Sequence, residues 1–143
     1  MTTRSNLNIL YKAVKPVPKL SALTKKTLKK LIMLEKTQFI ELNILFCNDN
    51  FIKNLNRTFR GKNKATDILT FYYETGRKTS LTGDITISLP TARRQAKHLG
   101  HILEEELKVL LVHGFYHLLG HDHLADDEYR KMQRKEIKAL KLV

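Results

Sequence analysis

Short segments in which apolar and polar residues alternate predict four β-strands. Asn6–Tyr11 and Phe39–Cys47 alternate with a period of two, which sends successive side chains to opposite faces of a sheet. Asp67–Tyr73 and Asp84–Leu89 are further short segments rich in β-branched or aromatic residues, as is typical of strands. We expect the first of the four strands to lie at the periphery of the sheet.

Apolar residues spaced by about one helical turn predict a helix over Lys19–Glu35. Leucines and an isoleucine form a stripe beside five lysines, which indicates an amphipathic helix with a basic outer face. A second helix, capped by Asn48 or Asp49, is expected to run to about Phe59. Its inward-facing side chains are predicted to be Phe51, Ile52, Leu55 and Phe59.

Three further helices are expected after the last strand. One begins at Pro90 and closes at Gly100, one opens with Glu104–Glu106 at its positive end, and one runs from Asp126 to about Leu142. The order β-α-β-α-β-β-α-α-α predicts a small mixed sheet of about four strands packed by about five helices. The expected class is therefore α+β (mixed α/β), with a single domain over residues 1–143.

Composition narrows the cellular setting. The one cysteine, Cys47, allows no internal disulfide, which suits a reducing compartment. The N-terminus lacks an apolar segment of signal-peptide type, and nothing approaches the roughly 18 apolar residues of a membrane span. We expect a soluble, cytoplasmic protein with no membrane partner.

Positive charge is concentrated in the first half of the chain. Residues 1–66 hold 14 Lys and Arg against three acids, whereas residues 67–143 hold 12 against 11. Such asymmetry favours a polyanionic partner, most often nucleic acid. The alternative is a lysine-rich surface that serves only solvation.

Four of the six histidines fall within eleven residues and suggest a metal site. His113 and His117 are four residues apart, so on a helix they share one face and can bind one ion. Gly120 offers an end for that helix. On a straight helix His121 would lie roughly 12 Å along the axis from His113, too far for bonds of about 2 Å. The third ligand must follow the turn, and His123 is favoured.

Three histidines without a cysteine favour an ion with one open position over a closed structural site. Such an ion can ionise a bound water and polarise a phosphoryl oxygen. Metzincin peptidases share the histidine spacing but need a Glu after the first histidine, where this chain has Gly114. The expected cofactor is one divalent ion, with zinc as first choice and nickel or another ion as alternatives.

Three separated segments resemble one family. His113-Gly-x-x-His117-Leu-x-Gly120-x-Asp122-His123 is similar to the signature of the YbeY family of bacterial rRNA-maturation endoribonucleases. Leu55–Phe71, with its Arg-Gly-Lys-x-Lys-x-Thr-Asp core, and Gly83–Ser88 resemble two further blocks of that family. The blocks follow in family order and span the chain from about residue 40 to 125.

The resemblance implies a metal-dependent, single-strand-specific endoribonuclease for 16S rRNA 3′-end maturation and ribosome quality control. Its implied partners are single-stranded RNA or rRNA and the ribosome or ribosomal proteins. It implies that His113, His117 and His123 bind the ion and that Arg60 is functional. Tyr116 stands where the family usually has an aliphatic residue and His121 where it often has an aromatic one, and neither change removes a matched ligand.

Arg60 is predicted to hold a phosphate through its planar guanidinium. Arg57 is a weaker candidate for the same task, and Lys62 and Lys64 are expected to contact the strand on either side. The attacking group is left open between water and the ribose 2′-hydroxyl.

Other assignments also stay open. Asp122 is either an orienting partner of an imidazole or a base. Asp84 is either functional or structural, in the latter case bonding backbone amides at a strand start. A non-catalytic ribosome- or RNA-binding factor with a structural metal, or a metallopeptidase with another base, are the alternative functions.

Overall fold

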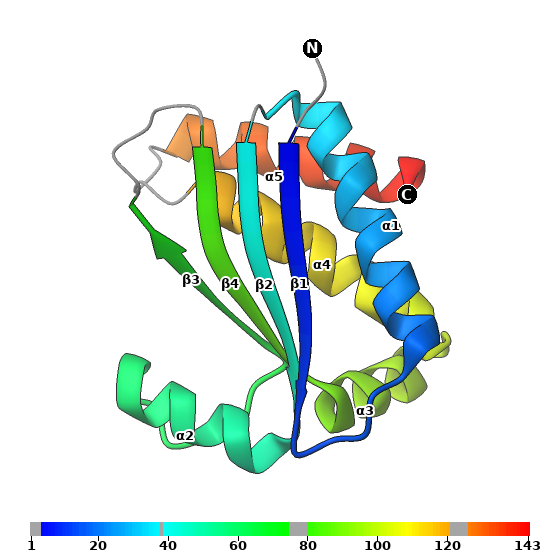
Figure 1. Cartoon of the computed structure of the whole chain (residues 1–143), viewed down its shortest axis with the longest axis vertical. Coiled ribbons are helices and arrows are strands. Elements are labelled where there is room, and N and C mark those ends of the chain that lie inside the picture. The colour runs from blue at the N-terminus through cyan, green and yellow to red at the C-terminus, as the bar shows by residue number, and fades with distance from the viewer. Residues whose placement is uncertain (1–3, 38, 75–79, 121–125) are drawn as a thin grey trace.

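The computed structural model describes residues 4–37, 39–74, 80–120 and 126–143, which form four strands and five helices (Figure 1). The elements follow the predicted order and confirm the α+β class. They are β1 (Arg4–Lys12), α1 (Pro18–Glu35), β2 (Phe39–Cys47), α2 (Asp49–Arg60), β3 (Ile68–Tyr73), β4 (Ser80–Ser88), α3 (Leu89–Leu99), α4 (Leu103–Leu119) and α5 (Asp126–Leu142). Among the described residues, no helix is both long and apolar enough to cross a membrane.

One mixed sheet contains all four strands in the order β1-β2-β4-β3. β1, β2 and β4 are parallel, and β3 runs antiparallel to β4. β1 and β3 are therefore the two edges, as expected for the first strand. The edge strand β3 stays paired with β4 along its whole length, from Ile68 to Tyr73.

The two faces of the sheet pack against different helices. Ile40, Leu42, Ile44 and Phe46 of β2 alternate onto one face and join the main core with residues of α1 and α4. A smaller cluster on the other face joins Cys47 and Leu69 of the sheet to Ile52 of α2. The edge strand β3 consequently lies between α2 on one face and α4 on the other.

The face of the sheet that α4 does not cover carries a row of side-chain hydrogen bonds across all four strands. Asn8 donates to Asn43 and Asn43 donates to Asp84, each over 3.0 Å, and the Tyr73 hydroxyl donates to Asp84 over 2.6 Å. β4 begins at Ser80, so Asp84 lies within the strand. The structural alternative for Asp84 placed it at the start of a strand, bonded to backbone amides. Asp84 instead lies inside β4, and side chains donate to it.

Helix α2 differs from its prediction at its C-terminal end. Asn48 is the cap, accepting from the backbone N–H of Phe51 over 2.9 Å, and Ile52 is buried as expected. The helix was expected to end at about Phe59, and it ends one residue later, at Arg60. Phe59, expected to face inward, is 60% exposed, and its ring contacts Phe71 of the edge strand β3 rather than the core.

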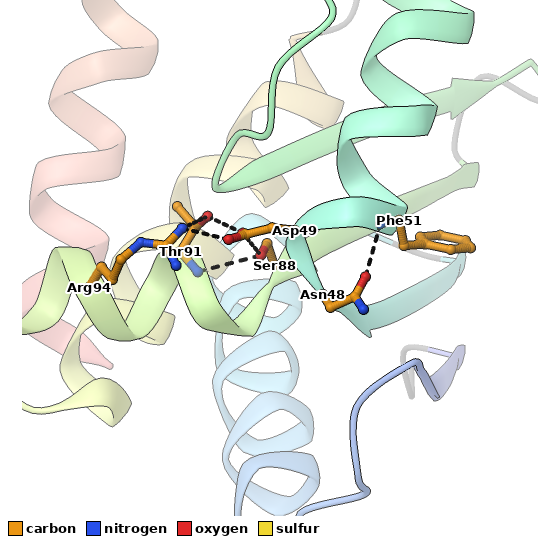
Figure 2. A network of polar contacts seen from close by, with 6 residues as sticks. All are labelled: Asn48, Asp49, Phe51, Ser88, Thr91 and Arg94. Atoms are coloured by element: carbon orange, nitrogen blue, oxygen red, sulfur yellow. Dashed lines mark hydrogen bonds and ion pairs between the residues drawn. The ribbon is translucent and has the colours of Figure 1, made fainter.

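A network centred on Asp49 joins the start of α2 to the start of α3 (Figure 2). Ser88 and Thr91 donate their hydroxyl protons to Asp49 Oδ1 over 2.6 and 2.5 Å, and Arg94 donates to Oδ2 over 2.6 Å. Burial alone would raise the pKa of Asp49, but these hydrogen bonds and the Arg94 charge hold it below its usual value. The ionised carboxylate thus fixes α2 relative to α3.

Candidate metal centre beside a basic sheet edge

His113 and His117 lie on the exposed side of an otherwise buried helical segment. The surrounding α4 residues from Leu110 to Leu118 are buried, whereas the two histidines are exposed. Their ring centroids are 6.2 Å apart with the ring planes inclined by 41°. Two imidazoles bound to one zinc ion at a tetrahedral angle have centroids roughly 5 Å apart when each bond is about 2.0–2.1 Å long. The observed separation is about 1 Å wider, so the two side chains would have to rotate toward each other to share an ion.

Glu136 of α5 contacts the first histidine. Its Oε1 atom lies 2.9 Å from Nδ1 of His113. The interaction engages Nδ1, so Nε2 is the ring nitrogen left to face a ligand. A carboxylate behind a histidine in this way is typical of histidines that bind metals.

His117 favours its neutral form. Partial burial lowers the pKa of His117 most strongly, and the positive charges of His113 and Arg60 lower it further, while Glu136 raises it. A neutral imidazole has the free lone pair that a metal ion requires.

Arg60 approaches the histidines from the other side of the sheet edge. Its Nη2 donates to the carbonyl oxygen of Thr70 in β3 over 2.7 Å, and its guanidinium carbon lies 5.1 Å from the centre of the Phe71 ring. The carbonyl bond and the ring fix the guanidinium at the sheet edge, yet the side chain stays exposed. A guanidinium has five N–H donors, so it can bind an anion while keeping the Thr70 bond.

Gly114 lets α4 approach the sheet closely. A Cβ atom at this position would lie 3.0 Å from Cδ1 of Ile68 and 3.4 Å from Cγ2 of Thr70. A glutamate side chain here would have to enter the packed interface between α4 and the sheet. The position of the peptidase base is therefore closed by packing as well as by residue type.

The expected third ligand falls on a segment that the structure does not describe. His121, Asp122 and His123 lie outside the described residues, and within those residues no group of three or more potential ligands forms. Cys47 lies on the other face of the sheet, in the small cluster with Ile52. Burial, with a smaller contribution from Asp49, raises its pKa to about 12, so it does not supply a thiolate at neutral pH.

An open cavity of about 640 Å³ adjoins His113. His113 and Glu136 form part of its wall, and α3 contributes Thr91, Arg94 and His98. The Asp49 network in Figure 2 holds Arg94 at this rim. The site thus combines a histidine pair, a neighbouring hollow and an arginine at the sheet edge.

Two features of the site were not predicted from the sequence. Glu136 is 23 residues from His113, and no local spacing links a carboxylate on the last helix to a histidine on the previous one. Phe59 fits the apolar period of α2, which is why it was expected in the core. Its partner is instead Phe71, with ring centroids 5.5 Å apart in an edge-to-face arrangement.

Among the other basic residues predicted to contact RNA, Arg57 donates a hydrogen bond to Asn54 over 3.3 Å. The side chains of Lys62 and Lys64 are exposed in the segment after α2. Tyr116 is almost fully enclosed, with 2% of its surface exposed.

A helical histidine pair beside an arginine, on an α+β fold, is compatible with a hydrolase that acts on phosphodiesters. The sequence model of the family described as Endoribonuclease YbeY matches residues 8–143. The chain belongs to this family, as its three sequence blocks predicted.

Relatives and one solved structure agree with this assignment. The chain is 43% identical over 103 residues to Endoribonuclease YbeY of Desulforamulus reducens, covering 67% of each protein. It is 46% identical over 97 residues to the protein of that name from Aquifex aeolicus, covering 67% of this chain and 65% of the relative. The solution structure of TM1509 from Thermotoga maritima matches with a TM-score of 0.66 and 27% identity, over 94% of this chain and 86% of that one.

Proposed function

We propose that this chain is a metal-dependent endoribonuclease that cleaves single-stranded RNA in the cytoplasm. Its proposed task is maturation of the 16S rRNA 3′ end and ribosome quality control, with the ribosome or its proteins as partners. The observation that carries the proposal is that the His113–His117 pair lies on α4, which packs on β3, and that Arg60 donates to the Thr70 carbonyl of the same strand. The names of the relatives support the endoribonuclease activity.

The proposed ligands of the ion are His113, His117 and His123. These residues suit a divalent metal ion, because the first two imidazoles share one exposed face of α4 and His117 favours its neutral form. A divalent ion bound here would supply an electrophile for a phosphoryl oxygen and an ionised water. Zinc is the first candidate, since imidazole nitrogens suit it well.

The chain's own residues are proposed to bind and orient the RNA. Arg60 faces a phosphate with the donors that Thr70 leaves free, and its planar fork neutralises charge that develops on the phosphoryl oxygens. Phe59 presents an exposed aromatic ring next to Phe71, a surface on which a base can stack. Lys62 and Lys64 are proposed to hold the strand beyond Arg60.

The test compares RNA cleavage by metal-loaded wild type, His117→Ala, Arg60→Ala and Arg60→Lys. We expect His117→Ala to abolish cleavage and Arg60→Ala to slow it roughly 10- to 150-fold, which corresponds to the loss of about 1.5–3 kcal/mol for hydrogen bonds to a charged group. Arg60→Lys should recover only part of the rate, because an ammonium cannot copy the planar fork. Arg93→Ala, which removes an exposed arginine from α3, is the matched control and should leave the rate unchanged.

Each competing function predicts a different result. Cleavage that survives in both His117→Ala and Arg60→Ala would indicate a contaminating nuclease and refute the site. RNA binding without any cleavage by the metal-loaded wild type would favour a non-catalytic RNA-binding factor. Hydrolysis of casein that depends on His117 would favour a peptidase, against the packing at Gly114.

A further inference from the structure

Glu136 and His113 form a contact between the last two helices of the chain. The carboxylate belongs to α5 and the imidazole to α4, and the atoms Oε1 and Nδ1 are 2.9 Å apart. The Glu136 side chain is 20% exposed and that of His113 is 54% exposed. The Glu136 carboxylate is therefore largely shielded from solvent, whereas the His113 ring that it contacts still reaches the surface.

The chemistry of the two groups decides how the ring is oriented. An ionised carboxylate only accepts hydrogen bonds, so Nδ1 of His113 must carry the proton. In a neutral imidazole the other nitrogen, Nε2, then holds the free lone pair. Without this partner the proton can reside on either nitrogen and the ring can rotate.

We propose that Glu136 is a positioning residue for the metal centre: it fixes the Nδ1–H tautomer of His113 and aims Nε2 at the ion. The inference rests on the proposed function, since it assigns Glu136 a task toward the ion that His113 and His117 would share. It adds α5, which none of the three family-like sequence blocks includes, to the elements that build the site.

The competing explanation is that Glu136 merely docks α5 onto the body of the protein. An ion pair in which one partner is as exposed as His113 contributes little to the stability of the fold. The neighbouring residue provides a matched control, because Lys135 reaches Glu35 of α1 over 3.3 Å and so also docks α5. Lys135→Ala removes a docking contact of α5 without touching His113.

The first measurement needs no metal. Nitrogen-15 NMR of the histidine side chains in the metal-free full chain at about pH 8 reports which ring nitrogen of His113 carries the proton. We expect the Nδ1–H form in wild type and in Lys135→Ala, and a change toward the Nε2–H form in Glu136→Ala. An Nε2–H form in wild type, or an unchanged tautomer in Glu136→Ala, would overturn the proposal.

The second measurement is the affinity for zinc, obtained by competition with a chromophoric chelator at the same pH. We expect Glu136→Ala to bind zinc about 10- to 100-fold more weakly than wild type. Glu136→Gln, which keeps an acceptor oxygen without the charge, should lose less, and Lys135→Ala should stay within about threefold. Circular dichroism establishes that each variant is folded.

The outcomes separate this inference from the function on which it rests. Equal zinc affinity in wild type and Glu136→Ala would overturn the role of Glu136 and leave the metal site standing. An equal loss in Lys135→Ala and Glu136→Ala would show that docking of α5 matters and not the hydrogen bond. Failure of the wild type to bind zinc or another divalent ion would overturn both proposals.

Discussion

Arg60 shows how much of a functional side chain's position comes from its immediate neighbours. Gly61 adopts a left-handed conformation, with φ of +69°, and ends α2 directly after Arg60. The guanidinium then meets a carbonyl of β3 and the face of Phe71. Because both contacts lie on an edge strand, the side chain is held in place without being buried.

Asp49 is the residue for which the structure predicts a dependence of stability on pH. Its pKa is lowered from 3.8 in the folded chain, so its ionised form stabilises the fold above that value. This contribution is lost as the pH falls through the folded pKa. We expect the free energy of unfolding of wild type to fall by about 1 kcal/mol more than that of Asp49→Asn between near-neutral and strongly acidic pH, allowing for partial exposure.

Urea unfolding at several pH values measures this difference. Asn48 remains in both proteins, so the cap of α2 is a constant. A parallel loss of stability in wild type and Asp49→Asn would contradict the role assigned to the network in Figure 2.

At the scale of elements, the site depends on how closely α4 packs on the sheet. Gly114 and Gly83 both lie in this contact, one on the helix and one on β4. Their lack of side chains brings the helix near the edge strand β3. The histidines on the outer side of α4 are thereby placed near the Arg60 side chain, which reaches the same strand from α2.

Gly83→Ala is expected to destabilise the fold through this contact. An added Cβ would lie 2.9 Å from the backbone oxygen of Phe71 and 3.1 Å from both terminal carbons of Leu118. The carbonyl cannot move without disturbing the β3–β4 ladder, so we expect a loss of about 1–3 kcal/mol. Thermal and urea unfolding measure it.

Gly100→Ala serves as the comparison. It adds a methyl group with nothing within 4 Å, at a left-handed position with φ of +74°. Its cost is backbone strain of about 1–2 kcal/mol at most. A loss for Gly83→Ala below that for Gly100→Ala would indicate that α4 can shift away from the sheet.

At the scale of the whole molecule, the basic charge is divided between two places. The lysines of α1 are exposed on a helix that packs beside β1, whereas Arg57, Arg60, Lys62 and Lys64 lie near β3, the opposite edge of the sheet. Figure 1 shows α1 and α2 on different sides of the molecule. A single RNA strand bound at Arg60 should therefore contact the basic residues near β3 much more than the lysines of α1.

The salt dependence of RNA binding tests this division. We expect Lys62→Gln/Lys64→Gln to reduce the slope of log K against log salt by about 0.7 for each RNA phosphate that the variant no longer neutralises. Lys29→Gln/Lys30→Gln removes the same charge from α1 and should change the slope less. Fluorescence anisotropy with a single-stranded oligoribonucleotide gives both slopes, and equal reductions would contradict a binding surface confined to the β3 edge.

Local sequence patterns predicted a large part of this structure. The period of two in Phe39–Cys47 located β2 to the residue, because each inward side chain has to meet the core. The i,i+4 spacing placed His113 and His117 on one face of α4 for a similar reason. Phe59 shows the limit, since an apolar period indicates which face of a helix is apolar but not where the partner surface ends.

The order of the elements, the mixed α+β class, the histidine pair and the family could all be predicted from the order of the amino acids. They follow from periodicity, caps and short motifs, which act over a few residues. Folding in three dimensions was needed to establish that Arg60 meets Thr70 and Phe71, that Gly114 faces the sheet, and that Glu136 bonds His113. These contacts join residues of different elements, and they exist because α2 and α4 pack against β3 while α5 packs against α4.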